Sequence, residues 1–105
     1  MEAKTIELDG KIYRLAYTNS ALCALEDRVD MVTLAGMANR KINTFCRNMM
    51  WAALIAYQPE TTLEEAGRLV DLYQQGYGGR EGLMALITEL QDRAGLVPHE
   101  EAEKN

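Results

Sequence analysis

The residues that most often catalyse reactions or bind metals are few in this sequence and stand far apart. The only histidine is His99, and the only cysteines are Cys23 and Cys46. A structural zinc site needs four nitrogen, sulfur or oxygen ligands, and a nucleophilic triad needs a histidine beside its serine or cysteine. Neither can be assembled here except through His99. We therefore expect no metal site, no cofactor and no enzymatic activity.

The two cysteines are expected to be reduced thiols that are buried or partly buried. Cys23 and Cys46 both fall within apolar stretches, and neither has a second cysteine nearby. Unpaired cysteines are commonly buried, and disulfides are rare in cytoplasmic proteins. We therefore expect a cytoplasmic protein. A structural disulfide between the two is the alternative, and no other feature of the sequence supports it.

Two further motifs resemble catalytic or phosphate-binding sequences but fit structural roles better. Glu64 and Glu65 stand at an expected helix start, where acidic side chains favour the helix dipole, so we do not expect a catalytic carboxylate pair. The glycine-rich run GYGGR, residues 76–80, lacks the Lys-Ser/Thr of a P-loop and follows no strand. We interpret it as a flexible connection whose Tyr77 and Arg80 could touch a partner.

The composition is typical of one acidic globular domain. The chain has 105 residues, of which 48% are hydrophobic and 26% charged, and its formal net charge is −5. Nucleic-acid-binding proteins usually present clustered cations to phosphates, whereas Arg40-Lys41 is the only adjacent basic pair here. The apolar run at residues 49–57 is shorter than the roughly 20 residues that span a bilayer. The N-terminus has no signal-peptide core. We expect no nucleic-acid partner, no membrane partner and no small-molecule substrate.

The first element is predicted to be a β-hairpin over residues 4–15. The sequence reads KTIEL, then Asp9-Gly10, then KIYRL, and Asp-Gly between alternating apolar residues is typical of a type I′ turn. A two-residue loop pairs Leu8 with Lys11 and so fixes the register of the strands. The other face of the hairpin carries Ile12 among polar side chains. One face is apolar and must pack on helices; it carries Ile6, Leu8, Tyr13 and Leu15.

The rest of the chain is predicted to be helical. Capping side chains precede three helices: Thr18-Asn19-Ser20, Asp30, and Thr62 in a capping box with Glu65. We expect a mainly α fold, in which an N-terminal β-hairpin precedes a bundle of four to five short helices. Residues 1–95 form a single domain, and residues 96–105 form a polar, flexible tail. The helical segments are residues 21–29, 31–41, 45–57, 63–75 and 80–94, with Gly95 as the final C-cap.

The third helix is apolar around most of its circumference. It starts at Asn43 or Thr44 and stops near Tyr57, because Pro59 follows. Helical spacing divides it into two faces. The expected core face carries Phe45, Cys46, Met49, Met50, Ala53, Ala56 and Tyr57. The opposite face carries Arg47, Asn48, Trp51, Leu54 and Ile55.

Two interpretations of that opposite face stay open. Other helices cover it within the monomer, or Arg47, Trp51, Leu54 and Ile55 form a contact patch for a second copy or another protein. Tryptophan flanked by aliphatic residues is typical of interface anchors and of cores alike, so the residue types do not decide between them.

Three stretches, taken in order, resemble a known family. They are LDGKIYRLAYTNSALCALEDR, then FCRNMMWAALIAYQPETTLEEAGRLVD, then GLMALITELQDR, within residues 6–93. A hairpin running into a helix that ends in Leu-Glu is followed by an apolar helix with Trp-Ala, a proline and Thr-x-Glu-Glu, and then by a final amphipathic helix. This pattern resembles the tail assembly chaperones of long-tailed bacteriophages, especially those related to gene transfer agents.

The resemblance implies a small, mostly helical, non-enzymatic protein. Its partners would be the tape measure protein and the tail tube protein, and a homo-oligomer is compatible with the family. It would act in the host bacterial cytoplasm and be missing from the mature virion. Two alternatives stay open: a structural tail or head–tail subunit that forms a ring, and a small helical DNA-binding regulator.

The resemblance also implies a second, longer form of the protein made by a minus-one ribosomal frameshift. The last residues, Glu103-Lys104-Asn105, can be encoded as GAA-AAA-AAC, which contains the slippery heptamer A-AAA-AAC in the correct phase. We therefore expect the frameshift site at or beside these codons. Reading the gene tests this expectation.

Overall fold

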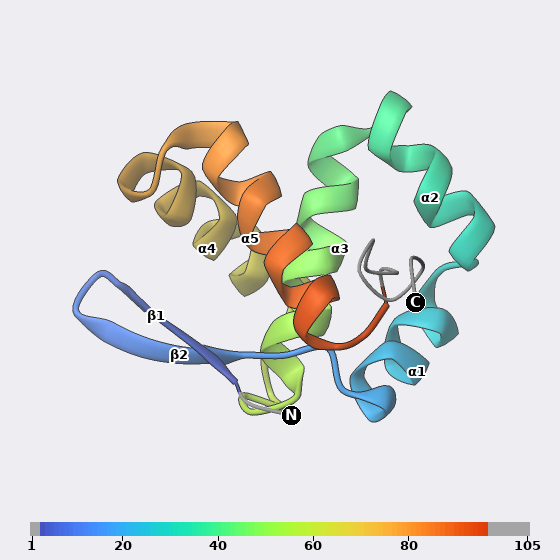
Figure 1. The fold of residues 1–105 in the computed structure, drawn as a ribbon, viewed down its shortest axis with the longest axis horizontal. Helices are drawn as coiled ribbons and strands as arrows, with labels where there is room; N and C mark the ends of the chain where they lie inside the picture. The colour runs from blue at the N-terminus through green and yellow to red at the C-terminus, as the bar shows by residue number, and fades with distance from the viewer. Residues whose placement is uncertain (1–2, 97–105) are drawn as a thin grey trace, which may run out of the picture.

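The computed structural model describes residues 3–96, in which two strands precede five helices (Figure 1). The predicted fold class, mainly helical with an N-terminal hairpin, is confirmed. The predicted tail beyond Leu96, which includes His99 and the residues of the frameshift hypothesis, lies outside the described residues. The elements are β1 (Lys4–Leu8), β2 (Lys11–Leu15), α1 (Asn19–Arg28), α2 (Met31–Arg40), α3 (Ile42–Ile55), α4 (Leu63–Gly76) and α5 (Gly79–Arg93).

The hairpin has the predicted turn and register. Asp9 and Gly10 have φ values of 55° and 78°, the left-handed geometry that a type I′ turn requires. All residue pairs between β1 and β2 agree with the predicted register. The expected apolar face is buried, whereas Ile12 on the other face is 63% exposed. The buried face packs against α3 and α4, which supply the apolar support that a two-stranded sheet lacks by itself.

Helix α3 occupies the centre of the molecule, with α1 and α2 on one side and α4 and α5 on the other (Figure 1). It contacts all four of these helices and β2. Its buried residues therefore lie on most sides of the helix, as expected for a helix that is apolar around most of its circumference. The predicted division of α3 into two faces is corrected, because Asn48 and Leu54 from the supposed opposite face are buried. Between Phe45 and Leu54, only Arg47 is exposed.

Gln58 joins the end of α3 to the outer edge of β2. Its Nε2 atom donates hydrogen bonds to the carbonyl oxygens of Leu54 and Arg14, at 2.7 and 2.9 Å. Its Oε1 atom accepts a bond from the Arg14 backbone N–H at 2.9 Å. The amide thereby occupies the outward-facing peptide groups of Arg14, as a neighbouring strand would. Tyr57, expected on the core face, is 39% exposed and lies beneath the Arg14 guanidinium.

Three helices begin with the predicted capping residues. The side chains of Thr18, Asp30 and Thr62 each accept a hydrogen bond from the backbone N–H three residues further on. The reciprocal half of the capping box is not formed, because the Glu65 carboxylate pairs with Arg68 instead, at 2.8 and 3.1 Å. α3 begins at residue 42, slightly earlier than predicted, and has no capping side chain.

The connection from α4 to α5 is a tight turn. Gly78 precedes α5 with a φ of 92°, in the left-handed region that favours glycine. A Cβ atom on Gly82 would lie 1.7 Å from the Tyr77 carbonyl oxygen, so this position admits no side chain. At its other end, α5 terminates as predicted: Gly95 has a φ of 75°, and Leu96 donates its backbone N–H to the Gln91 carbonyl at 2.9 Å.

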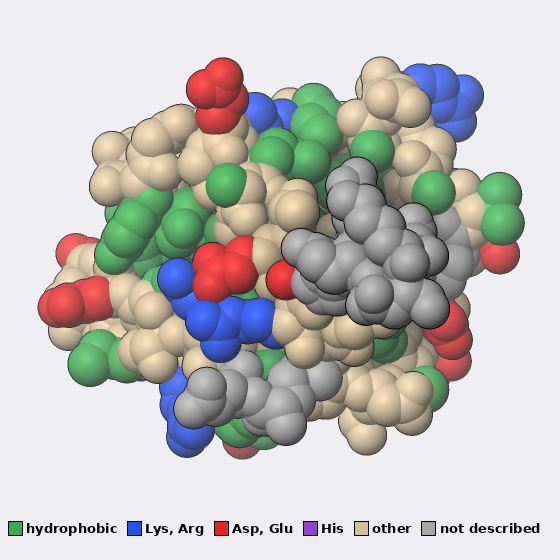
Figure 2. Space-filling model, in the orientation of Figure 1, with side chains coloured by type: hydrophobic (Ala, Val, Ile, Leu, Met, Phe, Trp, Pro, Cys, Tyr) green, Lys and Arg blue, Asp and Glu red, His purple; other side chains and the backbone are tan. Residues whose placement is uncertain are grey.

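Lys4 ties the start of the hairpin to α5. Its Nζ atom lies 3.3 Å from Oε1 of Glu89, whose Oε2 atom accepts a bond from Arg93 at 3.0 Å. Near the middle of the face of the molecule drawn in Figure 2, acidic and basic side chains lie side by side. Partial burial raises the pKa of Glu89, but the hydrogen bonds from Lys4 and Arg93 outweigh it and leave the pKa below its usual value.

Candidate functional site

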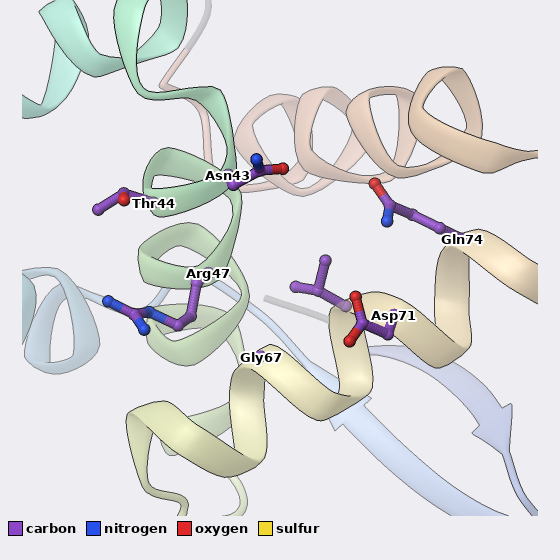
Figure 3. A pocket seen from close by; sticks show the side chains of 7 residues that line it. Asn43, Thr44, Arg47, Gly67, Asp71 and Gln74 are labelled. Atoms are coloured by element: carbon purple, nitrogen blue, oxygen red, sulfur yellow. The ribbon is translucent and has the colours of Figure 1, made fainter.

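A polar cleft of about 290 Å³ opens between α3 and α4 (Figure 3). The first turns of α3 supply one wall, and the middle of α4 supplies the other. Helical spacing brings Asp71 and Gln74, which are two of the polar residues of α4, to the side of the helix that lines the cleft. The lining residues are Asn43, Thr44, Arg47, Gly67, Val70, Asp71 and Gln74.

Arg47 is positioned by a glycine on the facing helix. A Cβ atom on Gly67 would lie 3.4 Å from Cδ of Arg47, so the aliphatic part of the arginine packs where α4 has no side chain. The guanidinium points away from Asp71 in Figure 3. The side chain is exposed, and its charged head makes no hydrogen bond or ion pair with any residue that the structure describes. Arg47 is therefore exposed at this end of the cleft, and its predicted contact with a partner stays a prediction.

Arg80, the second predicted arginine, holds three helices together at the rim of the cleft. From the start of α5, its Nε atom donates to Oε1 of Gln74 at 2.8 Å, and its Nη2 atom donates to Oδ1 of Asn43. Arg80 thus bonds two of the residues that line the cleft, whereas Arg47 lines the cleft itself. Because Arg80 already has these bonds and is half-buried, its first role is to fix the helices.

The apolar members of the predicted contact patch differ in exposure. Leu54 is fully buried, so the expectation that it contacts a partner is corrected: the elements packed around α3 cover this residue. Trp51 and Ile55 are half-buried. The indole N–H of Trp51 donates to the Thr61 carbonyl at 2.9 Å, and the Arg28 guanidinium lies 5.0 Å from the ring centre. Trp51 therefore anchors the segment after α3 and leaves only part of its surface to solvent.

Tyr77 lies apart from the cleft, where the end of α4 meets the hairpin. Its ring stacks on Tyr73, with centroids 4.4 Å apart and planes inclined by 8°. Its hydroxyl donates to the Glu7 carbonyl at 2.9 Å, while the side chain remains 43% exposed. The six predicted site residues therefore do not form one patch. Of the six, only Arg47 lines the cleft, and Arg80 bonds two of its lining residues.

Burial favours the neutral forms of two titratable groups inside the fold, Tyr17 and Cys46. Burial raises the pKa of the Tyr17 phenol, whose hydroxyl donates to the Met49 carbonyl at 3.0 Å. Burial also raises the pKa of the Cys46 thiol, although Arg80 acts in the opposite direction. Both cysteines are free thiols, as predicted. Cys46 is buried, but the expected burial of Cys23 is wrong, because this residue lies on the exposed side of α1. A thiol with a raised pKa is a weak nucleophile at neutral pH.

The chemistry of the cleft suits hydrogen bonding and ion pairing to a polypeptide, because it combines amide, hydroxyl and oppositely charged groups. Within residues 3–96, no three side chains of His, Cys, Asp or Glu are placed to hold a metal ion. No helix among these same residues has the length and apolar character needed to cross a membrane.

The sequence matches no protein-family model, and comparison with curated proteins and with solved structures finds no match.

Proposed function

We propose that this chain is a non-enzymatic chaperone of phage tail assembly, which binds the tape measure protein and assists assembly of the tail tube. Its resemblance to that family in three stretches supports the proposal, and so does its fold, a small helical protein that begins with a hairpin. The place of action is the host bacterial cytoplasm, and the mature virion lacks the protein. The net charge of −5 favours solubility of a complex with an apolar client.

The observation that carries the proposal is a strip of side chains along α3, formed by Arg47, Trp51 and Ile55. These residues are spaced four apart, so they follow one line on the helix surface. Arg47 offers an exposed guanidinium without a partner in the described chain, and the other two offer partly exposed apolar surface. Arginine and aromatic residues are enriched at protein interfaces. The α3 strip is thus a dispersed contact surface for a client helix.

The test is co-expression with the tape measure protein encoded by the same phage or prophage. Wild-type chain is expected to keep the tape measure protein soluble and to co-purify with it. The double variant Arg47→Glu, Ile55→Ala should bind at least about tenfold more weakly, since a few central residues dominate most interfaces. Lys11→Glu is the matched control, because it makes the same charge change at the tip of the hairpin.

Leu54 is left out of this double variant because it lies in the core. Leu54→Ala is expected to lower the free energy of unfolding by about 2–5 kcal/mol, which would confuse loss of binding with loss of structure. Unchanged binding by a folded double variant would contradict the assignment of the α3 strip. If wild-type chain fails to bind the tape measure protein, or is found in purified particles, the chaperone function itself is wrong.

A further inference from the structure

The outer edge of β1 presents unused backbone groups. Gln58 bonds the backbone N–H and carbonyl of Arg14, so these two groups point away from β1. Thr5 is the cross-strand partner of Arg14, so its own N–H and carbonyl point outward from β1. Because backbone groups alternate in direction along a strand, the N–H and carbonyl of Glu7 point outward as well. Of the four outward groups of Thr5 and Glu7, one has a partner: the Glu7 carbonyl accepts a hydrogen bond from the Tyr77 hydroxyl. The N–H groups of Thr5 and Glu7 and the Thr5 carbonyl have none within the described chain.

A recess runs along this same edge. It has a volume of about 390 Å³ and lies between β1 and the end of α4. Figure 2 shows hydrophobic side chains gathered on this face, where the hairpin passes α4 in Figure 1. The stacked rings of Tyr73 and Tyr77 form one wall, and the 63% exposed Ile12 lies at the other side. An exposed strand edge beside an apolar recess is how proteins bind extended peptides by strand addition.

We propose that the β1 edge binds an extended, cationic segment of a partner protein as a third strand of the sheet. Backbone donors and acceptors two residues apart, at Thr5 and Glu7, match the repeat of a β-strand and are satisfied together only by another extended backbone. This surface is separate from the α3 strip and does not depend on the chaperone function.

The charge of the occupant follows from Glu7. Its exposed side chain makes no ion pair within the described chain, and the residue directly opposite on an added strand would be its nearest cross-strand neighbour. Lysine or arginine at that position is therefore favoured. Two residues along, the neighbour of Thr5 is favoured to be β-branched, as in other sheets. The net charge of −5 also favours a basic segment, because it attracts positively charged partners at long range.

A second copy of the chain fits this recess less well than a foreign segment. Its own β1 edge lies in the same kind of recess beside α4, so pairing two β1 edges would also bring the two α4 helices together. Its β2 edge is covered at Arg14 by the Gln58 amide. A free, extended segment meets neither obstacle.

The test uses the full chain as bait for a displayed library of random nonapeptides. The Thr5→Pro variant serves for counter-selection, because proline removes the outward N–H while leaving the bonds between β1 and β2 in place. Peptides enriched on the wild-type chain are expected to alternate β-branched residues with lysine or arginine. Their amide signals and those of Thr5 and Glu7 should become protected from hydrogen exchange on binding.

The affinities of one enriched synthetic peptide for single variants then separate the contribution of the Thr5 N–H from that of the Glu7 carbonyl. Thr5→Pro should weaken binding at least about tenfold, whereas Thr5→Val, which keeps the N–H, should change it by less than about twofold. Tyr77→Phe should strengthen binding by about threefold to tenfold, because the hydroxyl no longer competes for the Glu7 carbonyl. Tyr57→Phe is the matched control on an exposed tyrosine away from the recess.

Three results would overturn the proposal. The first is a library that enriches nothing over the Thr5→Pro counter-selection. The second is equal binding by a peptide whose alternate backbone amides are methylated, which decides the question even if Thr5→Pro does not fold. The third is self-association of the free chain that Thr5→Pro abolishes, because a second copy would then be the occupant. None of these results bears on tape measure binding at the α3 strip.

Discussion

Removing the Gln58 side chain should loosen the joint between α3 and the hairpin. Gln58→Ala deletes two hydrogen bonds to the Arg14 backbone, each 2.9 Å long. The third bond, to Leu54, counts for less because that carbonyl also accepts the Gln58 backbone N–H at 2.7 Å. Net hydrogen bonds contribute about 0.5–1.5 kcal/mol each, and water can reach these exposed groups, so we expect a loss of about 1–2 kcal/mol. For a domain of this size, that loss lowers Tm by about 5–10 °C.

Thermal unfolding followed by circular dichroism measures the shift, and hydrogen exchange locates it. The Arg14 amide should exchange faster in Gln58→Ala, while the Tyr13 amide, which bonds across the hairpin, should change little. Gln75→Ala is the matched control, since Gln75 is exposed on α4 and holds no other element. A Tm within about 1 °C of wild type, with Arg14 exchange unchanged, would show that the amide does not stabilise the edge.

Two further predictions concern single positions. Gly82→Ala is expected to cost at least about 3 kcal/mol, because its Cβ would overlap the Tyr77 carbonyl, whereas Gly36→Ala in α2, where a Cβ meets nothing within 4 Å, should gain about 0.5–1 kcal/mol. Urea unfolding compares the two, and similar effects would contradict the packing of the α4–α5 turn. Glu89→Gln should cost up to about 1 kcal/mol at pH 7, because the folded-state pKa of Glu89 lies below its unfolded value of about 4.3. That contribution is present above the unfolded pKa and is lost as pH falls through the folded pKa. The free energies of unfolding of wild type and variant should therefore converge near about pH 2. A difference that persists at that pH would assign the loss to packing instead.

The parts of the fold that follow from short-range chemistry were predictable from the sequence. Asp9-Gly10 determines the turn, and a two-residue loop leaves one register for the strands. Thr18, Asp30 and Thr62 mark helix starts because their side chains accept backbone bonds three residues away. Each of these signals and its structural consequence lie within a few residues of each other.

The site could be predicted only in part, because it depends on which helices come to face one another. Periodicity showed that α3 is apolar on most sides, but not that α1, α2, α4 and α5 all contact it, and Leu54 was therefore misplaced. The bridge from Arg80 to Asn43 and Gln74 joins three helices and leaves no local pattern in the sequence. Gly67 could have been a signal, since a glycine inside a helix often marks a close approach of another group.

The central position of α3 has a consequence for how the chain acquires its structure. The hairpin and the flanking helices rest their apolar faces on α3, which lies in the middle of the sequence. During synthesis, the first 41 residues emerge before their main packing surface exists, and they can bury little until α3 follows them. Because the segments on both sides of α3 share that surface, the protein should gain and lose its tertiary structure as a single cooperative unit.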